Sequence, residues 1–328
     1  MPKNSILITG GAGYIGSHVN QIVRNAGYNT IVLDNLSRGN RQTIFNTEFI
    51  KGDIGDKNIL DDIFNKFSIQ AVMHFAAFID VGESVRNPKI YYENNFSQTL
   101  NLLSSMAQHH IEYFVFSSSA AIFGYPKKPC IDETHPCHPI NPYGFSKLMI
   151  ENALEDFEKT YGIKSCCLRY FNAAGGDPHH QIKYYQSNPT NLIPIALKCL
   201  KTKKALTIFG NDYQTKDGTC VRDYIHIDDL AHAHLLALEH LKKTNCSSRY
   251  NLGNGQGYSI HEVIKAIQLV TKKTVQFQIS SRREGDPPIL ISDSNLAFKE
   301  LHWAPQYPDL ESMIDHAWHA MHLETSYA

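Results

Sequence analysis

Tyr143 and Lys147 are the two residues of this sequence whose types and spacing most clearly suggest chemistry. Residues four positions apart lie on one face of a helix, so a helix here would hold the lysine cation near the tyrosine ring. A neighbouring cation favours the phenolate and lowers the pKa of a tyrosine toward neutrality. Ser119, which ends a run of three serines 24 residues upstream, could position or relay a proton. The pattern predicts a proton-transfer site, although many such pairs only pack on helices.

A glycine-rich turn near the amino terminus predicts binding of a dinucleotide. Gly10, Gly13 and Gly16 follow an apolar run at residues 5–9 and precede a helical pattern at 14–26. Glycines at these places let the turn close tightly, let the backbone approach a pyrophosphate and let the helix pack on the sheet. The helix end then offers backbone N–H groups and a positive dipole end to phosphate. Together with Tyr143, this turn indicates proton transfer beside a nicotinamide ring.

Asp34, at the end of the second expected strand, indicates which dinucleotide binds. A carboxylate there accepts hydrogen bonds from the adenosine ribose hydroxyls and repels a 2′-phosphate, so the expected cofactor is NAD. Arg38 and Arg41 lie nearby and leave NADP as the alternative, since arginines accommodate that phosphate. Asp53, followed by Ile54, is placed either to hold the adenine edge or merely to end a strand.

Short apolar runs alternate with helical patterns through the first half of the chain. We expect strands at 5–9, 30–33, 48–53, 71–75, 113–118 and 164–170, and helices at 14–26, 58–67 and 91–109. This alternation predicts an α/β fold with a Rossmann-type, doubly wound parallel sheet. From about Gly175 the loops are rich in His, Pro, Asn and Gly, and strands such as 206–209 are shorter. We therefore expect a first domain at 1–175, to which 221–244 returns, and a smaller C-terminal α/β domain at 176–328 ending in a frayed tail at 323–328.

The composition is that of a globular protein without a polyanionic partner. The 328 residues include 42% hydrophobic and 19% charged residues with a formal net charge of −1, which argues against nucleic acid or an anionic membrane. The apolar runs are too short to span a bilayer, and residues 1–4 lead directly into a strand, so no signal peptide is expected. The seven cysteines lack C-x-x-C spacing, which favours free thiols in a reducing cytoplasm. The histidine pairs at 109–110 and 179–180 lack zinc-ligand spacing, so no metal is expected.

Many stretches resemble the UDP-glucose (UDP-galactose) 4-epimerases, a branch of the extended short-chain dehydrogenase/reductases. Between Ile6 and about His319 they are TGGAGYIGSH at 9–18, GDI at 52–54, VGESV at 81–85, FSSSA at 116–120, NPYGFSK at 141–147, LRYFN at 168–172, IFGNDYQTKDGTCVRDYIHIDDLA at 208–231, YNLG at 250–253 and RREGD at 282–286. The resemblance implies NAD-dependent 4-epimerisation of a UDP-hexose, UDP-galactose to UDP-glucose, through a transient 4-keto intermediate.

Carried over onto matching positions, the resemblance implies roles for individual residues. Tyr143 would be the general base and acid, Lys147 would bind the nicotinamide ribose and polarise Tyr143, and Ser119 would hydrogen-bond the sugar. The implied cofactor positions are Gly10, Gly13, Tyr14, Ile15, Gly16, Asp34, Asn35, Asp53, Ile54, Phe75, Ala76, Ala77, Asn94, Lys147 and Tyr170. The implied substrate positions are Ser119, Tyr143, Asn172, Asn191, Leu192, Phe209, Arg222, Arg283, Asp286 and Leu290, with Phe209 at a uracil contact.

The implied residues suit the implied chemistry. A free tyrosine has a pKa of about 10, and both Lys147 and a cationic nicotinamide ring would favour the phenolate that acts as a base. Arg222 and Arg283 can make forked contacts to a diphosphate while the hexose stays loosely held and turns over in the site. Each arginine could instead form a surface ion pair, with Asp223 and Glu284 respectively.

Several positions depart from the pattern of related chains. Ile79 stands where a lysine often follows the fourth strand, and Phe123 stands where tyrosine is usual. Leu290 matches a position that is tyrosine in strict hexose epimerases and smaller in those that accept N-acetylated sugars, so a UDP-N-acetylglucosamine or dual-specificity 4-epimerase is the alternative. Ala120 and Ala121 occupy positions where sugar-nucleotide 4,6-dehydratases have Asp-Glu, which excludes that branch.

The sequence leaves two alternative functions open, and the resemblance implies an assembly. A nucleotide-sugar reductase or dehydrogenase would use an exchangeable cofactor, whereas an epimerase should keep NAD bound. A non-catalytic NAD(H)-sensing protein would keep the glycine turn but has no need for Ser119, Tyr143 and Lys147 together. By resemblance, we expect a cytoplasmic homodimer that pairs through the helices at 91–109 and 143–161.

Overall fold

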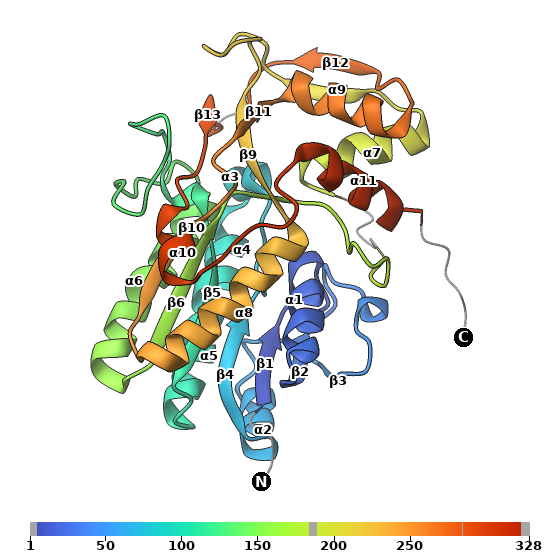
Figure 1. The fold of residues 1–328 in the computed structure, drawn as a ribbon. Helices are drawn as coiled ribbons and strands as arrows, with labels where there is room; N and C mark the ends of the chain where they lie inside the picture. The colour runs from blue at the N-terminus through green and yellow to red at the C-terminus, as the bar shows by residue number, and fades with distance from the viewer. Residues whose placement is uncertain (1–4, 184–188, 284, 323–328) are drawn as a thin grey trace.

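A computed structural model describes residues 5–183, 189–283 and 285–322, and its centre is a seven-stranded parallel sheet (Figure 1). The strand order is β10–β6–β5–β4–β1–β2–β3. The strands are β1 (Ser5–Thr9), β2 (Asn29–Asp34), β3 (Glu48–Lys51), β4 (Ile69–His74), β5 (Tyr113–Ser119), β6 (Lys164–Tyr170) and β10 (Ser248–Leu252). The order reverses between β1 and β4, and open α/β sheets bind ligands at the carboxyl ends of such strands. The predicted Rossmann-type sheet is confirmed.

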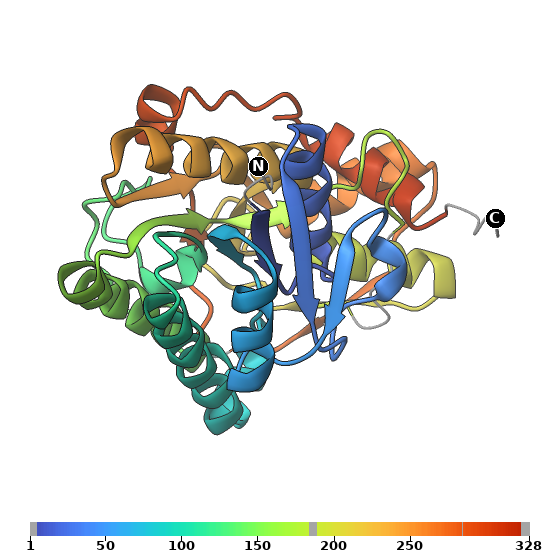
Figure 2. The ribbon, with the colours of Figure 1, turned by 90° about the horizontal axis from the view of Figure 1, so that it is seen from below.

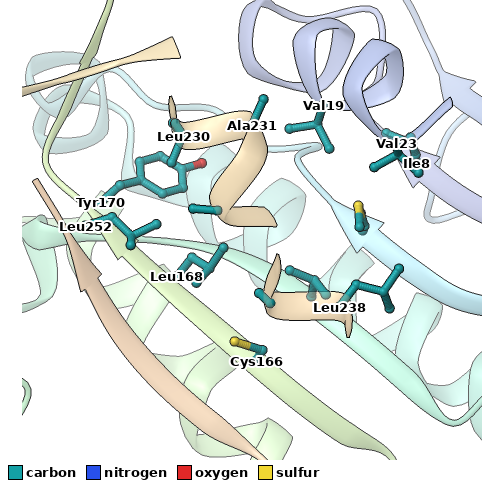
Figure 3. Packing of buried hydrophobic residues seen from close by; sticks show 14 of the residues in the cluster. Ile8, Val19, Val23, Cys166, Leu168, Tyr170, Leu230, Ala231, Leu238 and Leu252 are labelled. Atoms are coloured by element: carbon teal, nitrogen blue, oxygen red, sulfur yellow. The ribbon is translucent and has the colours of Figure 1, made fainter. Parts of the chain in front are cut away.

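Two hydrophobic clusters cover the two faces of this sheet (Figure 2). One face carries α1 (Tyr14–Asn25) and α8 (Ile227–Thr244); the other carries α2 (Lys57–Lys66), α5 (Gln98–Gln108) and α6 (Pro142–Tyr161). Figure 3 shows the first cluster, to which Val19 of α1, Leu230 and Leu238 of α8 and Leu168 of β6 contribute. Because helices cover both faces, the central strands are apolar without alternation.

The helix predicted at 91–109 is divided into three parts. α4 (Pro88–Tyr91) leads into a π-helical segment, Tyr92–Ser97, and α5 begins only at Gln98. The side chain of Asn95, buried in this segment, accepts a hydrogen bond from the Phe78 N–H at 2.8 Å and donates to the Phe78 carbonyl at 2.9 Å. The wide turn is thus held by the loop after β4, a contact that helical periodicity does not reveal. The other predicted strands and helices agree with the structure to within two residues.

The smaller elements lie beyond the carboxyl ends of the large sheet (Figure 1). β7 (Asn172–Ala174), β9 (Val221–His226), β11 (Gly257–Ser259) and β13 (Ile289–Leu290) form one sheet, and β8 (Leu206–Phe209) pairs with β12 (Phe277–Ser280). The helices here are α7 (Leu192–Thr202), α9 (Ile260–Thr271) and α11 (Leu310–Ala320). α10 (Asn295–Glu300) packs on β10, and α3 (Val81–Arg86) follows β4. A separate apolar cluster fills the space between α7, α9 and α11.

The strands β9 and β10, which are joined through α8, lie in different sheets. β9 pairs with β7, β11 and β13 and does not join the large sheet, whereas β10 joins that sheet beside β6. α8 and β10 thus pack with the large sheet, and β9 belongs to the smaller one. Tyr250 and Leu252 of β10 are fully buried, so pairing with β6 removes their apolar surface from water. The tail predicted at 323–328 lies outside the described residues.

The cysteines and the helices agree with two bulk expectations. All seven cysteines fall within the described ranges and are free thiols, and Cys166 and Cys167 are buried in β6. Burial raises the pKa of both thiols, which suits inert core residues. Within 5–183, 189–283 and 285–322, no helix is long and apolar enough to cross a membrane.

Candidate active site

The glycine turn between β1 and α1 lies against the end of β4. Gly10 has φ of +71°, and a Cβ at this position would stand 2.5 Å from the Ala76 nitrogen. A Cβ at Gly16 would overlap the carbonyl oxygen of Gly10. Gly13 is the N-cap of α1, and no side chain of the described residues caps this helix. The surface of the turn is therefore backbone, as close approach of a pyrophosphate requires.

Asp34 ends β2 directly beside this turn. One oxygen of its carboxylate accepts the Ala12 N–H at 3.0 Å, and the other accepts the Leu36 N–H at 2.7 Å. Burial raises the pKa of Asp34, whereas these two hydrogen bonds lower it. Next along the chain, Asn35 donates to Asp53 at 2.8 Å, which joins the loops after β2 and β3. The predicted ribose and adenine positions therefore meet at one edge of the sheet.

Arg38 and Arg41, which left NADP open in the sequence, both have partners within the chain. Arg38 forms an ion pair with Glu83 at 3.1 Å. Arg41 donates to the Ile44 carbonyl at 2.8 Å. A 2′-phosphate would have to displace these partners and would also face the Asp34 carboxylate. The arrangement favours NAD.

Aromatic and amide side chains continue the predicted cofactor positions past β4. The Phe75 ring lies 4.8 Å from the His234 ring, and Tyr170 approaches the same histidine at 5.9 Å. Asn94, in the π-helical segment, donates to Asn95 at 2.9 Å. The predicted positions that follow the carboxyl ends of β1 to β4 are Gly10, Gly13, Tyr14, Ile15, Gly16, Asp34, Asn35, Asp53, Ile54, Phe75, Ala76 and Ala77.

Ser119 ends β5, Tyr143 lies in the first turn of α6, and the Ser119 hydroxyl is close enough to Tyr143 to lower the pKa of its phenol. Asn141 begins α6 by accepting the Gly144 N–H at 2.8 Å. Gly144 packs so closely on the turn after β5 that a Cβ there would overlap the Ala121 carbonyl oxygen. This close approach of helix and strand end brings the predicted acid/base residue to the predicted sugar-binding serine.

Lys147 lies one turn further along α6, as its spacing predicts, and it is directed to the backbone of β5. Its Nζ donates to the Ser117 carbonyl at 2.7 Å and stands 4.8 Å from the centroid of the Phe116 ring. Burial lowers the pKa of Lys147 to about 7. Burial also raises the pKa of Tyr143, and the hydrogen bond with Ser119 offsets this only in part. The expected lowering of the tyrosine pKa is therefore not a property of the Tyr–Lys pair alone.

The two arginines predicted to hold a diphosphate have partners other than those weighed in the sequence. Arg222, on β9, pairs with Asp286 and not with Asp223. Asp223 is fully buried and accepts backbone N–H groups, and burial raises its pKa to about 6. The guanidinium of Arg283 stacks over Phe209, 4.6 Å from the ring centroid. Each pair thus joins two of the residues that the resemblance assigned to the substrate.

The predicted asparagines stand at the starts of two elements. Asn172 begins β7 and donates to the Asp223 carbonyl at 3.0 Å. Asn191 is the N-cap of α7 and Leu192 its first residue. The Asn191 side chain does not cap this helix within the described residues, which leaves its amide to other partners. Glu284, weighed as a partner of Arg283, lies outside those residues.

Leu290 belongs to an apolar cluster beside the turn after β5. It is paired in register with Arg222, is 9% exposed, and packs in a cluster with Phe123 and Phe171. Phe123 is fully buried, and its ring meets the His135 ring edge-on at 5.6 Å. A tyrosine hydroxyl at position 123 would therefore need a buried partner, so the loss of the hydroxyl found in related chains is accommodated by apolar packing.

Other residues singled out in the sequence lie apart from these contacts. Ile79 is 44% exposed in the loop after β4. His109 pairs with Asp61 at 2.9 Å rather than with a second histidine. Across the ranges that the structure describes, no three His, Cys, Asp or Glu side chains are grouped so that they could hold a metal ion.

Sequence reasoning missed two buried polar groups behind the site. His74, at the end of β4, is hydrogen-bonded to threonine hydroxyls through both ring nitrogens, at 2.7 and 3.0 Å. Glu151, two turns after Tyr143 on α6, is buried in an ion pair with Arg169 at 2.6 Å. The spacing of Glu151 from Lys147 was visible in the sequence, but only the tertiary structure shows that this acid is buried.

The fold and the site together define a short-chain dehydrogenase/reductase type of protein: a dinucleotide turn, an acid at the end of β2, and a Ser–Tyr–Lys set beside them. The sequence matches the NAD dependent epimerase/dehydratase family over residues 6–253, and the chain belongs to this family. The UDP-glucose 4-epimerase of Halalkalibacterium halodurans is 49% identical over 96% of this chain and 94% of its own length.

Solved structures of 4-epimerases are also similar to this chain. The UDP-glucose 4-epimerase of Brucella ovis, solved in complex with NAD, superposes with a TM-score of 0.94 at 41% identity, covering 98% of this chain and 99% of that one. The UDP-Glc/GlcNAc 4-epimerase of Campylobacter jejuni superposes with a TM-score of 0.84 at 42% identity, covering 97% of this chain and 99% of that one. The resemblance identified in the sequence is therefore confirmed.

Proposed function

We propose that this chain catalyses the NAD-dependent 4-epimerisation of UDP-hexoses and interconverts UDP-galactose and UDP-glucose. The observation that carries the proposal is the meeting of Ser119 and Tyr143 at the junction of β5 and α6, with Lys147 buried on the same helix. Relatives at 49% and 44% identity over nearly the whole chain carry the name UDP-glucose 4-epimerase, which supports the same reaction here.

The residues around the glycine turn fit NAD. The crowding at Gly10 and Gly16 keeps side chains off this surface, so the backbone from Gly10 to Gly16 would hold the pyrophosphate. Asp34 would accept hydrogen bonds from the adenosine ribose, and Asn35, Asp53 and Ile54 would border the adenine. Phe75, Ala76, Ala77, Asn94, Lys147 and Tyr170 would surround the nicotinamide ribose and ring. When bound, NAD would take up the C4 hydride, return it to the opposite face of the sugar, and favour the phenolate of Tyr143 through its positive ring.

Tyr143 would take the proton from O4 of the sugar and give it back on the other face. Ser119, beside Tyr143, would orient O4 through a hydrogen bond from its hydroxyl. Lys147 would bind the ribose hydroxyls and supply positive charge, and its pKa of about 7 keeps a protonated fraction at neutral pH. Positioned acid/base groups of this kind contribute about 10²–10⁴-fold to the rate.

The elements beyond the sheet would hold the UDP moiety. Arg222 and Arg283 would bind the diphosphate, because guanidinium groups make charge-assisted contacts to phosphate oxygens. The remaining positions proposed for UDP are Asn172, Asn191, Leu192, Phe209, which would stack on the uracil, and Asp286, which orients Arg222. Accordingly, we assign NAD binding chiefly to residues 1–175 and UDP-sugar binding chiefly to 176–328.

Leu290 favours acceptance of N-acetylated sugars as well. Its side chain is smaller than a tyrosine and joins an apolar cluster beside Ser119, so the hexose would have more room at this wall. The Campylobacter jejuni neighbour, at 42% identity, bears the name UDP-Glc/GlcNAc 4-epimerase. UDP-galactose, UDP-GalNAc and UDP-arabinose assayed side by side would decide the preference.

We also propose that the protein is a homodimer and that it is cytoplasmic. Phe145 and Tyr161 on α6 are 48% and 60% exposed, and burial of these rings against a second copy would support a homodimer. The free thiols support a reducing cytoplasm.

Conversion of UDP-galactose by the purified protein tests the proposed function. UDP-glucose should form without added cofactor or net oxidation, and NAD should remain with the protein through gel filtration. A sugar product that accumulates only with added, stoichiometrically consumed cofactor would indicate a reductase or dehydrogenase. Absence of any turnover would support an NAD(H)-sensing protein instead.

A further inference from the structure

Each of the three serines at the end of β5 is tied to a different residue of one helical face. Residues 143, 147 and 151 are spaced four apart on α6. Ser119 lies beside Tyr143 and lowers its pKa, and Lys147 donates to the Ser117 carbonyl at 2.7 Å. The Ser118 hydroxyl donates to Glu151 at 2.5 Å. The first two contacts belong to the proposed reaction, whereas the third is not used by it.

Glu151 lies in an enclosed polar network behind these serines. Its side chain is 1% exposed, and it accepts three hydrogen bonds from the guanidinium of Arg169 at 2.6–3.2 Å. Arg249, on β10, stands 3.5 Å from the same carboxylate. Arg169 immediately precedes Tyr170, whose hydroxyl is bonded to the hydroxyl of Ser117. One carboxylate thus links α6, the end of β5 and the end of β6.

Burial of such a pair is not explained by stability alone. Buried ion pairs can often be replaced by apolar residues of similar size without loss of stability, because the desolvation of two charges offsets their attraction. Glu151 contacts Ser118, the neighbour of Ser119, and lies on the same helical face as Lys147. It is therefore placed to influence the proposed site.

We propose that Glu151 is a positioning residue of the reaction, which holds Ser117–Ser119 and Tyr170 in register with Lys147 and sets the charge that Lys147 brings to the site. The catalytic role in this inference rests on the proposed function, whereas the contacts of Glu151 are independent of that function.

The charges around Lys147 support this role. Burial lowers the pKa of Lys147 to about 7, and the negative charge of Glu151 acts in the opposite direction. His74, on β4, adds no positive charge near Lys147, because burial and the lysine lower its pKa to about 3 and keep the imidazole neutral at pH 7. Tyr143 and Tyr170 have pKa values raised by burial and are neutral at pH 7.

Groups that face Glu151 from other elements are mostly cationic or neutral. Arg169 and Arg249 are the cations, and Cys137 and Cys167 are thiols with pKa values raised by burial. Replacing Glu151 with glutamine would remove the negative charge and leave Arg169 without its carboxylate partner, whereas Arg249 would keep Glu155. Both changes disfavour a protonated Lys147, so its pKa should fall below about 7.

The test compares Glu151→Gln with Glu155→Gln, a matched change one turn further along α6. Glu155 pairs with Arg249 at the surface and is 50% exposed. Loss of the Lys147 proton should appear as the alkaline limb of the pH profile of kcat/KM for UDP-galactose. We expect Glu151→Gln to move this limb to lower pH by about one unit, so that kcat/KM at a given pH on the limb falls about tenfold. Glu155→Gln should leave the limb in place. Glu151→Asp, which restores the charge, should restore the limb.

A direct readout separates this inference from the proposed function. NMR titration of protein with isotope-labelled lysine, with Lys147 assigned through Lys147→Arg, reports the lysine pKa whether or not the protein turns over UDP-galactose. If Glu151→Gln does not fold, the double variant Glu151→Met/Arg169→Met removes both buried charges together and should still show the lowered lysine pKa. An unshifted Lys147 titration in the folded variant, with activity lost equally at every pH, would make Glu151 a purely structural residue and overturn the inference.

Discussion

Tyr143, in the first turn of α6, lies beside Ser119 at the end of β5, although 24 residues separate them in the chain. Their proximity depends on Gly144, which packs against the Ala121 carbonyl with no room for a Cβ. Asn141 fixes where the helix starts by capping it. The proposed acid/base site is therefore built by one close helix–strand contact rather than by a flexible loop.

Tyr143→Phe should abolish most activity while leaving the fold intact. The substitution removes only the hydroxyl that is proposed to transfer the O4 proton, so kcat should fall by about 10²–10⁴-fold with KM little changed. Steady-state kinetics with UDP-galactose measures this. Tyr161→Phe, the same change at the exposed far end of α6, is the control and should be silent. Near-normal turnover by Tyr143→Phe would show that Tyr143 is not the acid/base residue.

Asp34→Asn should weaken NAD binding and relax discrimination against NADP. The amide removes the charge that repels a 2′-phosphate and loses one acceptor for the ribose, a cost of about 1.5–3 kcal/mol for a hydrogen bond to a charged group. NAD that copurifies with the protein, and the ratio of the Kd values of NAD and NADP, measure the effect. Asp56→Asn, at the N-cap of α2, is the matched control, because asparagine caps as well as aspartate. An unchanged Kd ratio would show that Asp34 does not select the cofactor.

Leu290→Tyr should narrow the sugar range. A tyrosine ring added beside Phe123 and Phe171 has to extend toward the sugar, because that cluster is closed. Turnover of UDP-GalNAc should fall at least about tenfold relative to UDP-galactose, an effect of about 1.4 kcal/mol on the ratio of kcat/KM values. Leu290→Met keeps the side-chain volume and should keep the ratio. Equal losses for both substrates in Leu290→Tyr would mean that position 290 does not act as a gate.

The protein should lose stability steeply as pH falls below about 6.5, the pKa of an unfolded histidine. Burial lowers the pKa of His74 and His226 to about 3 and that of His234 to about 4, and all three side chains are 0–1% exposed. The unfolded chain binds more protons than the folded one in the window from about 3 to 6.5, so stability rises with pH there. Each histidine contributes about 1.4 kcal/mol per pH unit.

Urea unfolding between pH 7 and pH 5 measures this slope. His234→Leu should reduce the contribution of these three residues by about one third, whereas His322→Leu, an exposed position near the end of α11, should leave it unchanged. A stability that is flat across this window would show that these histidines take up protons without unfolding.

The parts of the fold and site that local pattern determines were predictable from the sequence. Gly10 and Gly16 must be glycine because backbone atoms would overlap a Cβ there, and such requirements are visible as residue types at fixed spacing. Asp34 ends its strand where expected, and Lys147 shares a helix face with Tyr143.

The parts that depend on distant contacts were not predictable. The π-helical segment is held by Asn95 bonding to Phe78, seventeen positions away. Arg222 selects Asp286 as its partner, 64 positions away, over the adjacent Asp223, because Asp223 is already occupied by backbone N–H groups. The pKa of Tyr143 depends on burial that only the packed structure provides.

The fate of a hydrogen label on C4 tests the central claim most directly. UDP-galactose carrying deuterium at C4 is incubated with the purified protein in ordinary water, and the UDP-glucose formed is analysed by mass spectrometry and NMR. Transient oxidation at C4, with Tyr143 handling only the O4 proton, predicts that deuterium stays on C4 and that the same experiment in D₂O introduces none there. Exchange of the C4 hydrogen with solvent would contradict the account, because it would mean that a base removes the carbon-bound hydrogen as a proton.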